Sequence, residues 1–416
     1  MSLERLESLR RDMKKCVRCS LCKLVPLPTI QQTRFTSGCP PVDAYHFHAY
    51  SGGGMQVMAL ALLDGRIGVD RDLAKVVSAC TTCGLCDVSC KFIMAAERQD
   101  VILALKEHIA ESGFGPVSRE EAPPSAHWAD GLKLKTLPAS KVRVLLLAGA
   151  GAGRDPRHAA TARRLAALLS SAGVDFGILE GGEPESGIEA YWTGQRDRFE
   201  ARVRQVLERL DSAGAQTIVT LCGEDLGMLR AKYPRYARAP RAKVMHASEF
   251  LLPLIEKGRL RLTRPIRSAV TYHDPCYLGR QSEPPQEWHG EERRTHGVMT
   301  YFVPPKPINY GVRGVFEAPR RILAAIPGLH PVEMHRIREY AYCCGGGGGV
   351  PEAHPNVARA AAVQRMEEAR SVGAEVLVTA CQHCRENLTR WQEGPSTPVV
   401  DLVDLVYEAA GLGEVS

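Results

Sequence analysis

The hydrophobic pattern divides the chain into a helical first quarter and an alternating remainder. Before about residue 112, apolar positions run in helical blocks, of which 52–63 and 95–111 are the clearest. Beyond residue 141, short apolar runs of strand length alternate with longer helical stretches. Strands that alternate with helices predict parallel sheets with flanking helices. We therefore expect an α-helical segment followed by an α/β region.

The α/β region contains an internal repeat. A strand at 217–221 ends in Cys222 and leads into a helix, just as a strand at 375–379 leads through Cys381 into another helix. Such self-similarity predicts two related lobes. The predicted strands of the first lobe are 142–147, 174–179, 217–221 and 243–246. The second has strands at 269–272, 331–334 and 375–379, helices at 318–325 and 354–372, and a strand-to-helix close at 399–410. We place the helical segment at 1–111, a linker rich in Pro and Gly at 112–141, and the lobes at 142–264 and 265–416.

Composition narrows the class of protein. The 416 residues are 44% hydrophobic with a net charge of +6, which is typical of a globular protein with ample core. Basic residues are not interleaved with aromatic ones, so no nucleic-acid partner is expected. The charged N-terminus is not a secretory signal, and no window approaches the roughly 20 apolar residues of a membrane-spanning helix. We expect a cytoplasmic protein, whose membrane contact, if any, is through a partner subunit.

Fourteen cysteines are many for a reducing compartment, where clustered thiols more often bind metal than form disulfides. Eight lie between Cys16 and Cys90, and five lie between Cys276 and Cys384. The grouping predicts two metal-binding regions. Cys222 stands alone, and we do not predict it as a ligand.

Two cysteine triplets in the helical segment have the Cys-x2-Cys-x2-Cys spacing of bacterial ferredoxins, in which the distant fourth cysteine ligates the other [4Fe–4S] cluster of a pair. Two positions depart from the simple pattern: the fourth cysteine after the first triplet is displaced to Cys39, and Lys91 rather than proline follows Cys90. Structural zinc is the alternative, although zinc sites usually show paired Cys-x2-Cys units. With the helical pattern around it, the segment is interpreted as an α-helical ferredoxin-like domain. His46 and His48 between the triplets could approach a cluster, but we interpret them as surface or packing residues. The crossed assignment predicts one cubane cluster on Cys16, Cys19, Cys22 and Cys90, and a second on Cys80, Cys83, Cys86 and Cys39.

The second metal-binding region is organised around Cys343 and Cys344, which run directly into five glycines at 345–349. Adjacent thiolates can hardly both serve one tetrahedral metal, but they can reach two neighbouring irons of a cluster. Glycines allow close approach of the backbone and leave N–H groups for cluster sulfurs, so Gly345 and Gly346 are predicted to contact the cofactor. Cys381-Gln-His-Cys384 alone would also fit a redox-active thiol pair at a helix N-terminus. A zinc or vicinal-disulfide site is the remaining alternative.

These motifs together resemble the CCG-domain family, whose type members are the cysteine-rich subunits of heterodisulfide reductase. The resemblance rests on His273-Asp-Pro-Cys276-Tyr-Leu-Gly-Arg280, Ala318-Pro-Arg320, Ile326-Pro-Gly328, Cys343-Cys344-Gly345 and Cys381-x2-Cys384. With two ferredoxin motifs in front, nearly the whole chain resembles the D-type subunit of that enzyme. The resemblance implies two CCG-type repeats, the first of which has glycines at 149–153 and 181–182 where its cysteines would be. It implies one further, noncubane-type [4Fe–4S] cluster on Cys276, Cys343, Cys344, Cys381 and Cys384, with His273 beside it.

An insert at 281–313, rich in Pro and aromatic residues, lengthens the gap between Cys276 and Cys343. It is similar to the insert of the D-like subunits in ATP-independent aromatic-acyl-CoA reductase complexes of anaerobes, the benzoyl-CoA reductase type. We interpret the insert as a partner-docking arm or as a lid over the cluster site, and a tolerated surface loop is the alternative.

We interpret the chain as an electron-transfer subunit that relays electrons between two cubane clusters and the CCG-site cluster, in a complex with flavin-, quinone- or ferredoxin-linked subunits. The relay is favoured because the first lobe lacks its cluster cysteines and the insert resembles a docking arm, whereas the heterodisulfide reductases themselves suggest catalysis. No flavin, nucleotide or haem motif is visible; the glycines at 149–153 lack the spacing of a dinucleotide loop. The alternative is a catalytic subunit that reduces a disulfide, and a zinc-stapled scaffold fits the triplets poorly. An open approach to the Cys343–Cys344 turn would favour catalysis, whereas an insert covering it would favour the relay. The sequence assigns no catalytic residue.

Overall fold

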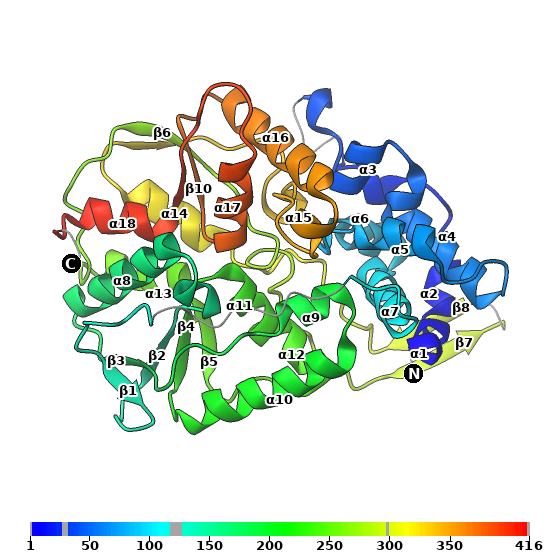
Figure 1. The fold of residues 1–416 in the computed structure, drawn as a ribbon, viewed down its shortest axis with the longest axis horizontal. Helices are drawn as coiled ribbons and strands as arrows, with labels where there is room; N and C mark the ends of the chain where they lie inside the picture. Colours follow the sequence, from blue (N-terminus) through cyan, green and yellow to red (C-terminus); the bar gives the residue numbers. More distant parts are fainter. Residues whose placement is uncertain (1, 27–31, 117–126, 297–298, 414–416) are drawn as a thin grey trace.

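The computed structural model describes residues 2–26, 32–116, 127–296 and 299–413. Figure 1 shows helices of the N-terminal quarter on one side and two sheets with their helices on the other. The strands of both larger sheets are parallel, as the alternating pattern predicts. The N-terminal helices are α1 (Ser2–Ser8), α2 (Arg10–Lys14), α3 (Pro40–Tyr45), α4 (Gly52–Leu63), α5 (Arg71–Ser78), α6 (Leu85–Met94) and α7 (Arg98–Glu111).

The N-terminal helices enclose a small apolar core. Leu6, Leu73, Val101 and Leu105 pack together there from α1, α5 and α7. Helix α4 starts where the Ser51 hydroxyl accepts the N–H of Gly54 at 3.0 Å, an N-cap arrangement. The helices predicted at 52–63 and 95–111 are confirmed as α4 and α7, with α7 beginning three residues later.

The first sheet has the strand order β1-β3-β2-β4-β5. Its strand β1 (Lys135–Leu137) falls inside the segment predicted as a linker, because a three-residue edge strand leaves little periodicity to read. Trp128, also in that segment, is buried in the core of this lobe. The other strands are β2 (Val144–Leu147), β3 (Phe176–Leu179), β4 (Thr217–Thr220) and β5 (Lys243–His246), and the helices are α8 (Pro156–Ser171), α9 (Ile188–Thr193), α10 (Arg196–Ser212), α11 (Gly223–Gly227), α12 (Tyr233–Tyr236) and α13 (Ala247–Glu256).

The second sheet has the order β11-β10-β6-β9. The strand expected at 331–334 is wrong in position, because β9 (Leu329–Pro331) ends where that segment begins. Met334 is buried beyond the strand, so its apolar side chain mimics a strand pattern without belonging to the sheet. The remaining elements are β6 (Ser268–Tyr272), β10 (Val376–Thr379) and β11 (Val399–Asp401), with α14 (Glu317–Ala325), α15 (Val350–Ala353), α16 (Pro355–Ser371), α17 (Gln382–Arg390) and α18 (Leu402–Ala410).

The insert forms an antiparallel hairpin of β7 (Glu291–Thr295) and β8 (Met299–Val303). The hairpin lies beside α1 and α2 in Figure 1, and Arg11 donates to Glu292 at 2.6 Å. The hairpin therefore extends along the N-terminal helices. No helix among the described residues is both long and apolar enough to cross a membrane.

The two sheets face each other at the carboxyl ends of their strands. Cys222 follows β4 and Cys381 follows β10, and the N–H of Gly223 donates to the carbonyl of Ala380 at 3.3 Å. Open parallel sheets bind ligands at these ends. The fold thus gathers the strand-end loops of both lobes at one place.

Candidate metal centre

All fourteen cysteines lie in the described residues, and all are free thiols. One group surrounds a small cavity near the surface of the N-terminal quarter, where Cys19 is exposed. The N–H of Gly53 donates to the sulfur of Cys22 at 3.3 Å, and Arg98 Nε donates to the sulfur of Cys90 at 2.8 Å. The four cysteines that line this cavity are Cys16, Cys19, Cys22 and Cys90.

The second group lies deeper in the same quarter. Burial raises the pKa of the Cys86 thiol, and the neighbouring Cys80 and Cys83 sulfurs add to this effect. Burial likewise raises the pKa of Cys39, again with contributions from Cys80 and Cys83. The N–H of Thr82 donates to the sulfur of Cys80 at 3.4 Å. The structure therefore brings the distant Cys39 to the second triplet.

The third group is centred on the two adjacent cysteines. Cys343 interacts with Cys276 and Cys344, and Cys384 interacts with Cys344 and Cys381. A ring nitrogen of His273 lies within 4.8 Å of the sulfurs of Cys344 and Cys384. His273 Nε2 is buried and has no hydrogen-bond partner among the described residues. The five thiols and this ring form one buried cluster of donors.

The second and third groups touch. Cys83 and Cys343 pack together in one buried cluster that also includes Val25 and Leu85. Contact with Cys343 is the largest influence on the pKa of Cys83, which lies well below its usual value. The side chain of Arg280 bridges both turns, because its Nε donates to the carbonyl of Cys83 and its Nη1 to that of Ala341, each at 2.6 Å.

The glycine run fits this crowded junction. The N–H groups of Gly345 and Gly346 donate to the sulfurs of Cys343 and Cys344 at 3.4 and 3.3 Å. A Cβ at Gly348, whose φ is +75°, would lie 2.5 Å from the carbonyl oxygen of Cys80. The glycines thus serve two purposes, because they donate to sulfurs and admit the backbone of the second cysteine group.

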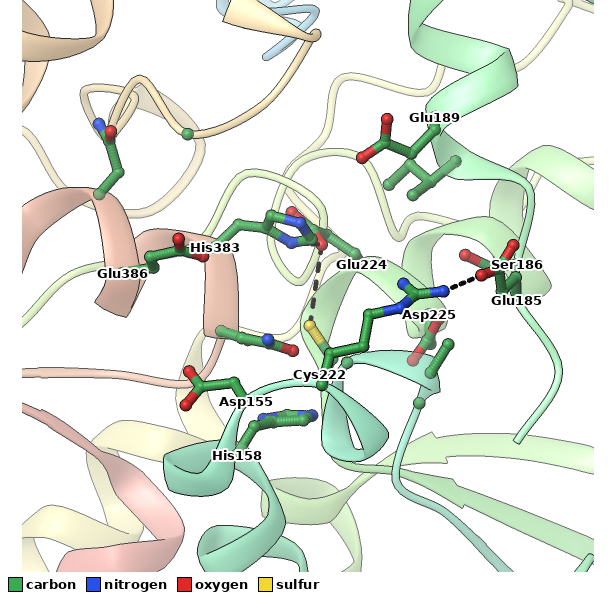
Figure 2. Close-up of a pocket in the computed structure, with 18 of the residues that line it drawn as sticks. Asp155, His158, Glu185, Ser186, Glu189, Cys222, Glu224, Asp225, His383 and Glu386 are labelled. Carbon is green, nitrogen blue, oxygen red and sulfur yellow. Dashed lines mark hydrogen bonds and ion pairs between the residues drawn. The ribbon is translucent and has the colours of Figure 1, made fainter. Parts of the chain in front are cut away.

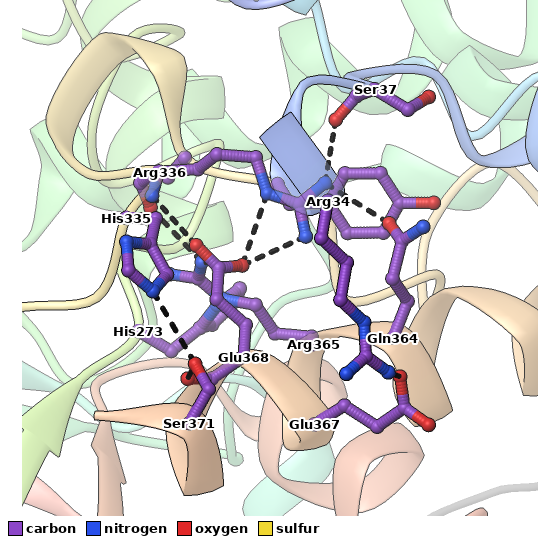
Figure 3. A network of polar contacts seen from close by, with 12 residues as sticks. Arg34, Ser37, His273, His335, Arg336, Gln364, Arg365, Glu367, Glu368 and Ser371 are labelled. Atoms are coloured by element: carbon purple, nitrogen blue, oxygen red, sulfur yellow. Dashed lines mark hydrogen bonds and ion pairs between the residues drawn. The ribbon is translucent and has the colours of Figure 1, made fainter. Parts of the chain in front are cut away.

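A buried ion network supports His273 (Figure 3). Arg365 Nε donates to His273 Nδ1 at 3.0 Å, and Glu368 accepts from both Arg365 and Arg336, at 2.7 and 2.8 Å. All three side chains of the ion pairs are fully buried. Arg336 also donates to the carbonyl of Ser37 at 2.5 Å, two residues before Cys39. The network therefore joins the third cysteine group to the loop that carries the last ligand predicted for the second cluster.

A further buried cation joins three parts of the chain. The ammonium of Lys106 on α7 donates to the carbonyls of Cys80 and Trp192 at 3.0 Å each, and to that of Gly348 at 3.5 Å. Burial lowers the pKa of Lys106 to about 8. Two cysteine-bearing turns and the first lobe thus meet at one side chain.

Two protein-family models match the chain. A model described as a 4Fe-4S dicluster domain matches residues 12–93, and one described as a cysteine-rich domain, CCG, matches residues 299–389. The D-type subunit of the Dihydromethanophenazine:CoB--CoM heterodisulfide reductase of Methanosarcina barkeri is 26% identical, covering 96% of this chain and 95% of that protein. The chain thus matches a 4Fe-4S dicluster domain and a CCG domain, and over nearly its whole length it is similar to this D-type subunit.

Two other relatives of this CCG-domain protein are longer than the chain. A "Probable membrane-anchored ferredoxin" of Chromohalobacter salexigens is 30% identical, over 81% of this chain and 48% of that protein. An "EtfAB:quinone oxidoreductase" of Syntrophomonas wolfei is 26% identical, over 64% of this chain and 34% of that protein. The chain therefore spans about a third to a half of these two relatives.

A cavity of about 480 Å³ lies between the two lobes of the CCG-domain protein (Figure 2). Its walls include Cys222, Glu224 and His383, with Gly346 at the edge of the third cysteine group. His383 forms an ion pair with Glu224, which raises the pKa of the imidazole against the effect of burial. No described residue of the hairpin lines this cavity. An approach to the CCG site therefore exists from the side of the first lobe.

Several residues at the site could not be selected from the sequence. His48, interpreted as a surface or packing residue, lines the first cysteine cavity and lies 3.3 Å from the Ser51 hydroxyl. His46 ends helix α3 in a left-handed conformation. Arg280 belongs to the motif around Cys276, which was the only signal for it. The sequence did not select Arg98 or Glu224. Glu224 follows Cys222 by two residues, but it meets the sulfur of Cys381 only through the tertiary fold.

Proposed function

We propose that the chain is an electron-transfer subunit that holds two cubane [4Fe–4S] clusters and one noncubane-type cluster. The donor sets fit iron–sulfur clusters, because each group offers several thiols and backbone N–H groups donate to sulfurs. The buried His273 Nε2 is available for a further bond. When bound, the clusters would supply one-electron transfer. The proposed ligands are those predicted from the sequence, in three sets: Cys16, Cys19, Cys22 and Cys90; Cys39, Cys80, Cys83 and Cys86; and Cys276, Cys343, Cys344, Cys381 and Cys384.

The contact between Cys83 and Cys343 carries the proposal. It places a predicted ligand of the second cubane directly against a predicted ligand of the CCG-site cluster. The first cysteine group is nearer the surface, and Val17, Phe92 and Ile93 beside it are exposed. A path from the surface group through the second group to the CCG site follows from this order.

Buried arginines along this path stabilise the reduced state of the proposed clusters. Arg98 contacts the first cysteine group, and Arg280 lies between the second and third groups. Arg365 donates a hydrogen bond to His273, beside the third group. A positive charge near a cluster stabilises its reduced, more negative state. The charges belong to the protein itself, so their effect does not depend on a partner.

Partner subunits are part of the proposal. The relatives' names include a quinone oxidoreductase linked to EtfAB and a membrane-anchored ferredoxin, which supports flavin-, quinone- or ferredoxin-linked partners and membrane contact through one of them. Because the hairpin of the insert does not cover the CCG site, we assign it to partner docking and not to a lid. The similarity of the insert to that of aromatic-acyl-CoA reductase subunits stays a prediction.

Disulfide reduction is the second candidate function, and the cavity between the lobes favours it. A catalytic site needs an approach for substrate, and this cavity reaches Gly346 and His383, both next to predicted ligands. The relay needs no such cavity. The two functions therefore differ in whether the isolated chain turns over a disulfide.

Iron and acid-labile sulfide analysis of anaerobically purified protein, with EPR of oxidised and dithionite-reduced samples, tests the proposal. Three clusters correspond to about twelve irons per chain. We expect an oxidised-state signal that disappears in a Cys343→Ser variant, while the reduced-state cubane signals persist. About eight irons and no such signal would reject the CCG-site cluster. Disulfide-dependent oxidation of a reduced viologen by the isolated chain would replace the relay with the catalytic function.

A further inference from the structure

We infer that Cys222 and Glu224 of the first lobe bind an iron of the CCG-site cluster together with Cys381. The inference rests on the proposed function, because it presupposes a cluster on the CCG cysteines. It adds two ligands from a lobe that otherwise has no cysteine. It differs from the sequence-based prediction, which left Cys222 outside the ligand set.

The pseudo-symmetry of the lobes places these residues together. Cys222 is the residue that precedes α11, and Cys381 is the residue that precedes α17. Both have extended backbone conformations at the turn from a strand into a helix. The hydrogen bond from Gly223 to Ala380 holds the two turns face to face. Equivalent turns of the two lobes therefore direct their cysteines at one point.

The donor atoms have the spacing of ligands on one metal ion. One donor atom each from Cys222, Glu224 and Cys381 lies within 4.8 Å of the other two. Glu224 Oε2 lies 3.9 Å from the sulfur of Cys222, and Glu224 Oε1 lies 3.7 Å from the sulfur of Cys381. A sulfur about 2.3 Å and an oxygen about 2.1 Å from a tetrahedral metal are roughly 3.6 Å apart. The observed separations are close to this value.

Burial separates this arrangement from a chance surface cluster. Cys222, Glu224 and Cys381 are 5%, 7% and 2% exposed. His383 pairs with Glu224 Oε2, whereas Oε1 faces the thiol of Cys381, and a thiol is only a weak hydrogen-bond donor. A cation bound between two thiolates and the carboxylate would compensate all three. His383, which pairs with Glu224, is the fourth side chain at this place.

The chemistry favours iron shared with the cluster over a separate ion. Thiolate ligands select iron–sulfur clusters or zinc among the common metals. Cys381 already belongs to the ligand set proposed for the CCG-site cluster, and its sulfur interacts with both Cys222 and Cys384. Figure 2 shows Cys222 and Glu224 at the wall of the cavity between the lobes. The iron that they hold would thus be the one nearest to that cavity.

The test compares Cys222→Ser and Glu224→Gln with Asp225→Asn in the anaerobically purified full chain. Asp225 is a matched control, because it lies in the same turn and lines the same cavity but does not belong to the donor group. Each protein is analysed for iron and zinc, by ⁵⁷Fe Mössbauer spectroscopy, and by EPR of the oxidised state. Retained cubane signals in the reduced state show that each variant folds.

We expect Cys222→Ser to lose iron relative to the parent, and Glu224→Gln to change the Mössbauer parameters of one iron site and the EPR g values. Asp225→Asn should match the parent. Unchanged spectra and iron content in both variants would overturn the inference while leaving the CCG-site cluster in place. Loss of zinc instead of iron from both variants would also overturn it, because the residues would then bind a separate zinc ion. A parent without any CCG-site signal would instead reject the proposed function.

Discussion

The side chains of Cys83 and Cys343 pack against each other, although 260 positions of sequence separate them. Arg280 fixes this junction from one side by donating to the carbonyls of Cys83 and Ala341. The proposed relay therefore depends on how the N-terminal helices pack against the second lobe. Single substitutions at this interface should therefore perturb the junction.

Replacement of Arg280 by methionine should lower the potentials of the clusters on both sides of the junction. The guanidinium is buried and interacts with Cys83, Cys276 and Cys343. A unit charge about 6 Å away at an effective dielectric constant of about 20 is worth on the order of 100 mV for one electron. Redox titrations followed by EPR measure the shift. An Arg280→Lys variant, which keeps the charge, should shift far less, and equal shifts in both variants would assign the effect to geometry.

Replacement of Arg98 by methionine should lower the potential of the cluster proposed on Cys16, Cys19, Cys22 and Cys90 more than that of the second cluster, because Arg98 interacts with Cys90 and Cys16 more than with Cys86. Arg98 Nε donates to the sulfur of Cys90, and hydrogen bonds to ligand sulfurs tune cluster potential. We expect a decrease of about 50–100 mV from the lost charge. Arg10→Met is the control, since Arg10 pairs at the surface with Glu7 and Asp64. A similar decrease in the control would show that net charge, and not the contact, sets the potential.

Gly348→Ala should disrupt the junction far more than Gly373→Ala. Both glycines have left-handed φ values, +75° and +76°, so both variants carry the roughly 1–2 kcal/mol conformational cost. A Cβ at Gly348 would also lie 2.5 Å from the Cys80 carbonyl oxygen, whereas no described atom would lie within 4 Å of one at Gly373. Overpacking adds about 1–3 kcal/mol or more. Denaturant unfolding compares the two, and equal losses would mean that the backbones near Cys80 and Gly348 can separate freely.

Glu368→Gln should cost about 3–5 kcal/mol of unfolding free energy near neutral pH, because it leaves two buried guanidinium groups without their carboxylate. Glu367→Gln is the matched control on the same helix, since Glu367 pairs with Arg34 at the surface. Its cost should stay below about 1 kcal/mol. Unfolding curves of the two variants give the comparison. Similar free energies of unfolding would show that the network contributes little to the stability of the CCG lobe.

The same variant has a defined pH dependence. Burial acts to raise the pKa of Glu368, but Arg365 and Arg336 outweigh it and hold the pKa below its usual value. The carboxylate therefore stabilises the fold fully above its unfolded pKa of about 4.3, and this contribution is lost as pH falls through the lower folded pKa. The stability difference between the parent and Glu368→Gln should shrink only in acid. A constant difference down to the lowest folded pH would contradict the assignment.

The sequence predicted the helices and strands that have a clear local hydrophobic periodicity. The helices at 52–63 and 95–111 and most strands of both sheets carry clear periodicity. The hairpin at 291–303 and the short β1 do not, and they were missed. The cysteine spacing selected thirteen thiols that the structure gathers into three groups. Arg336, Glu368 and Lys106 could not be selected in this way, because their partners come from distant segments and a buried charge resembles a surface charge in the sequence.

The three carbonyl partners of Lys106 belong to three parts of the chain: the second cysteine triplet, the first lobe and the glycine run. Unfolding any one of these parts would leave a buried ammonium with fewer acceptors, which costs free energy in the other two. We therefore expect the three parts to unfold together rather than as independent modules. A truncated chain that keeps only the N-terminal helices would lose this anchor, so cluster assembly in that fragment is a poor guide to cluster assembly in the whole protein.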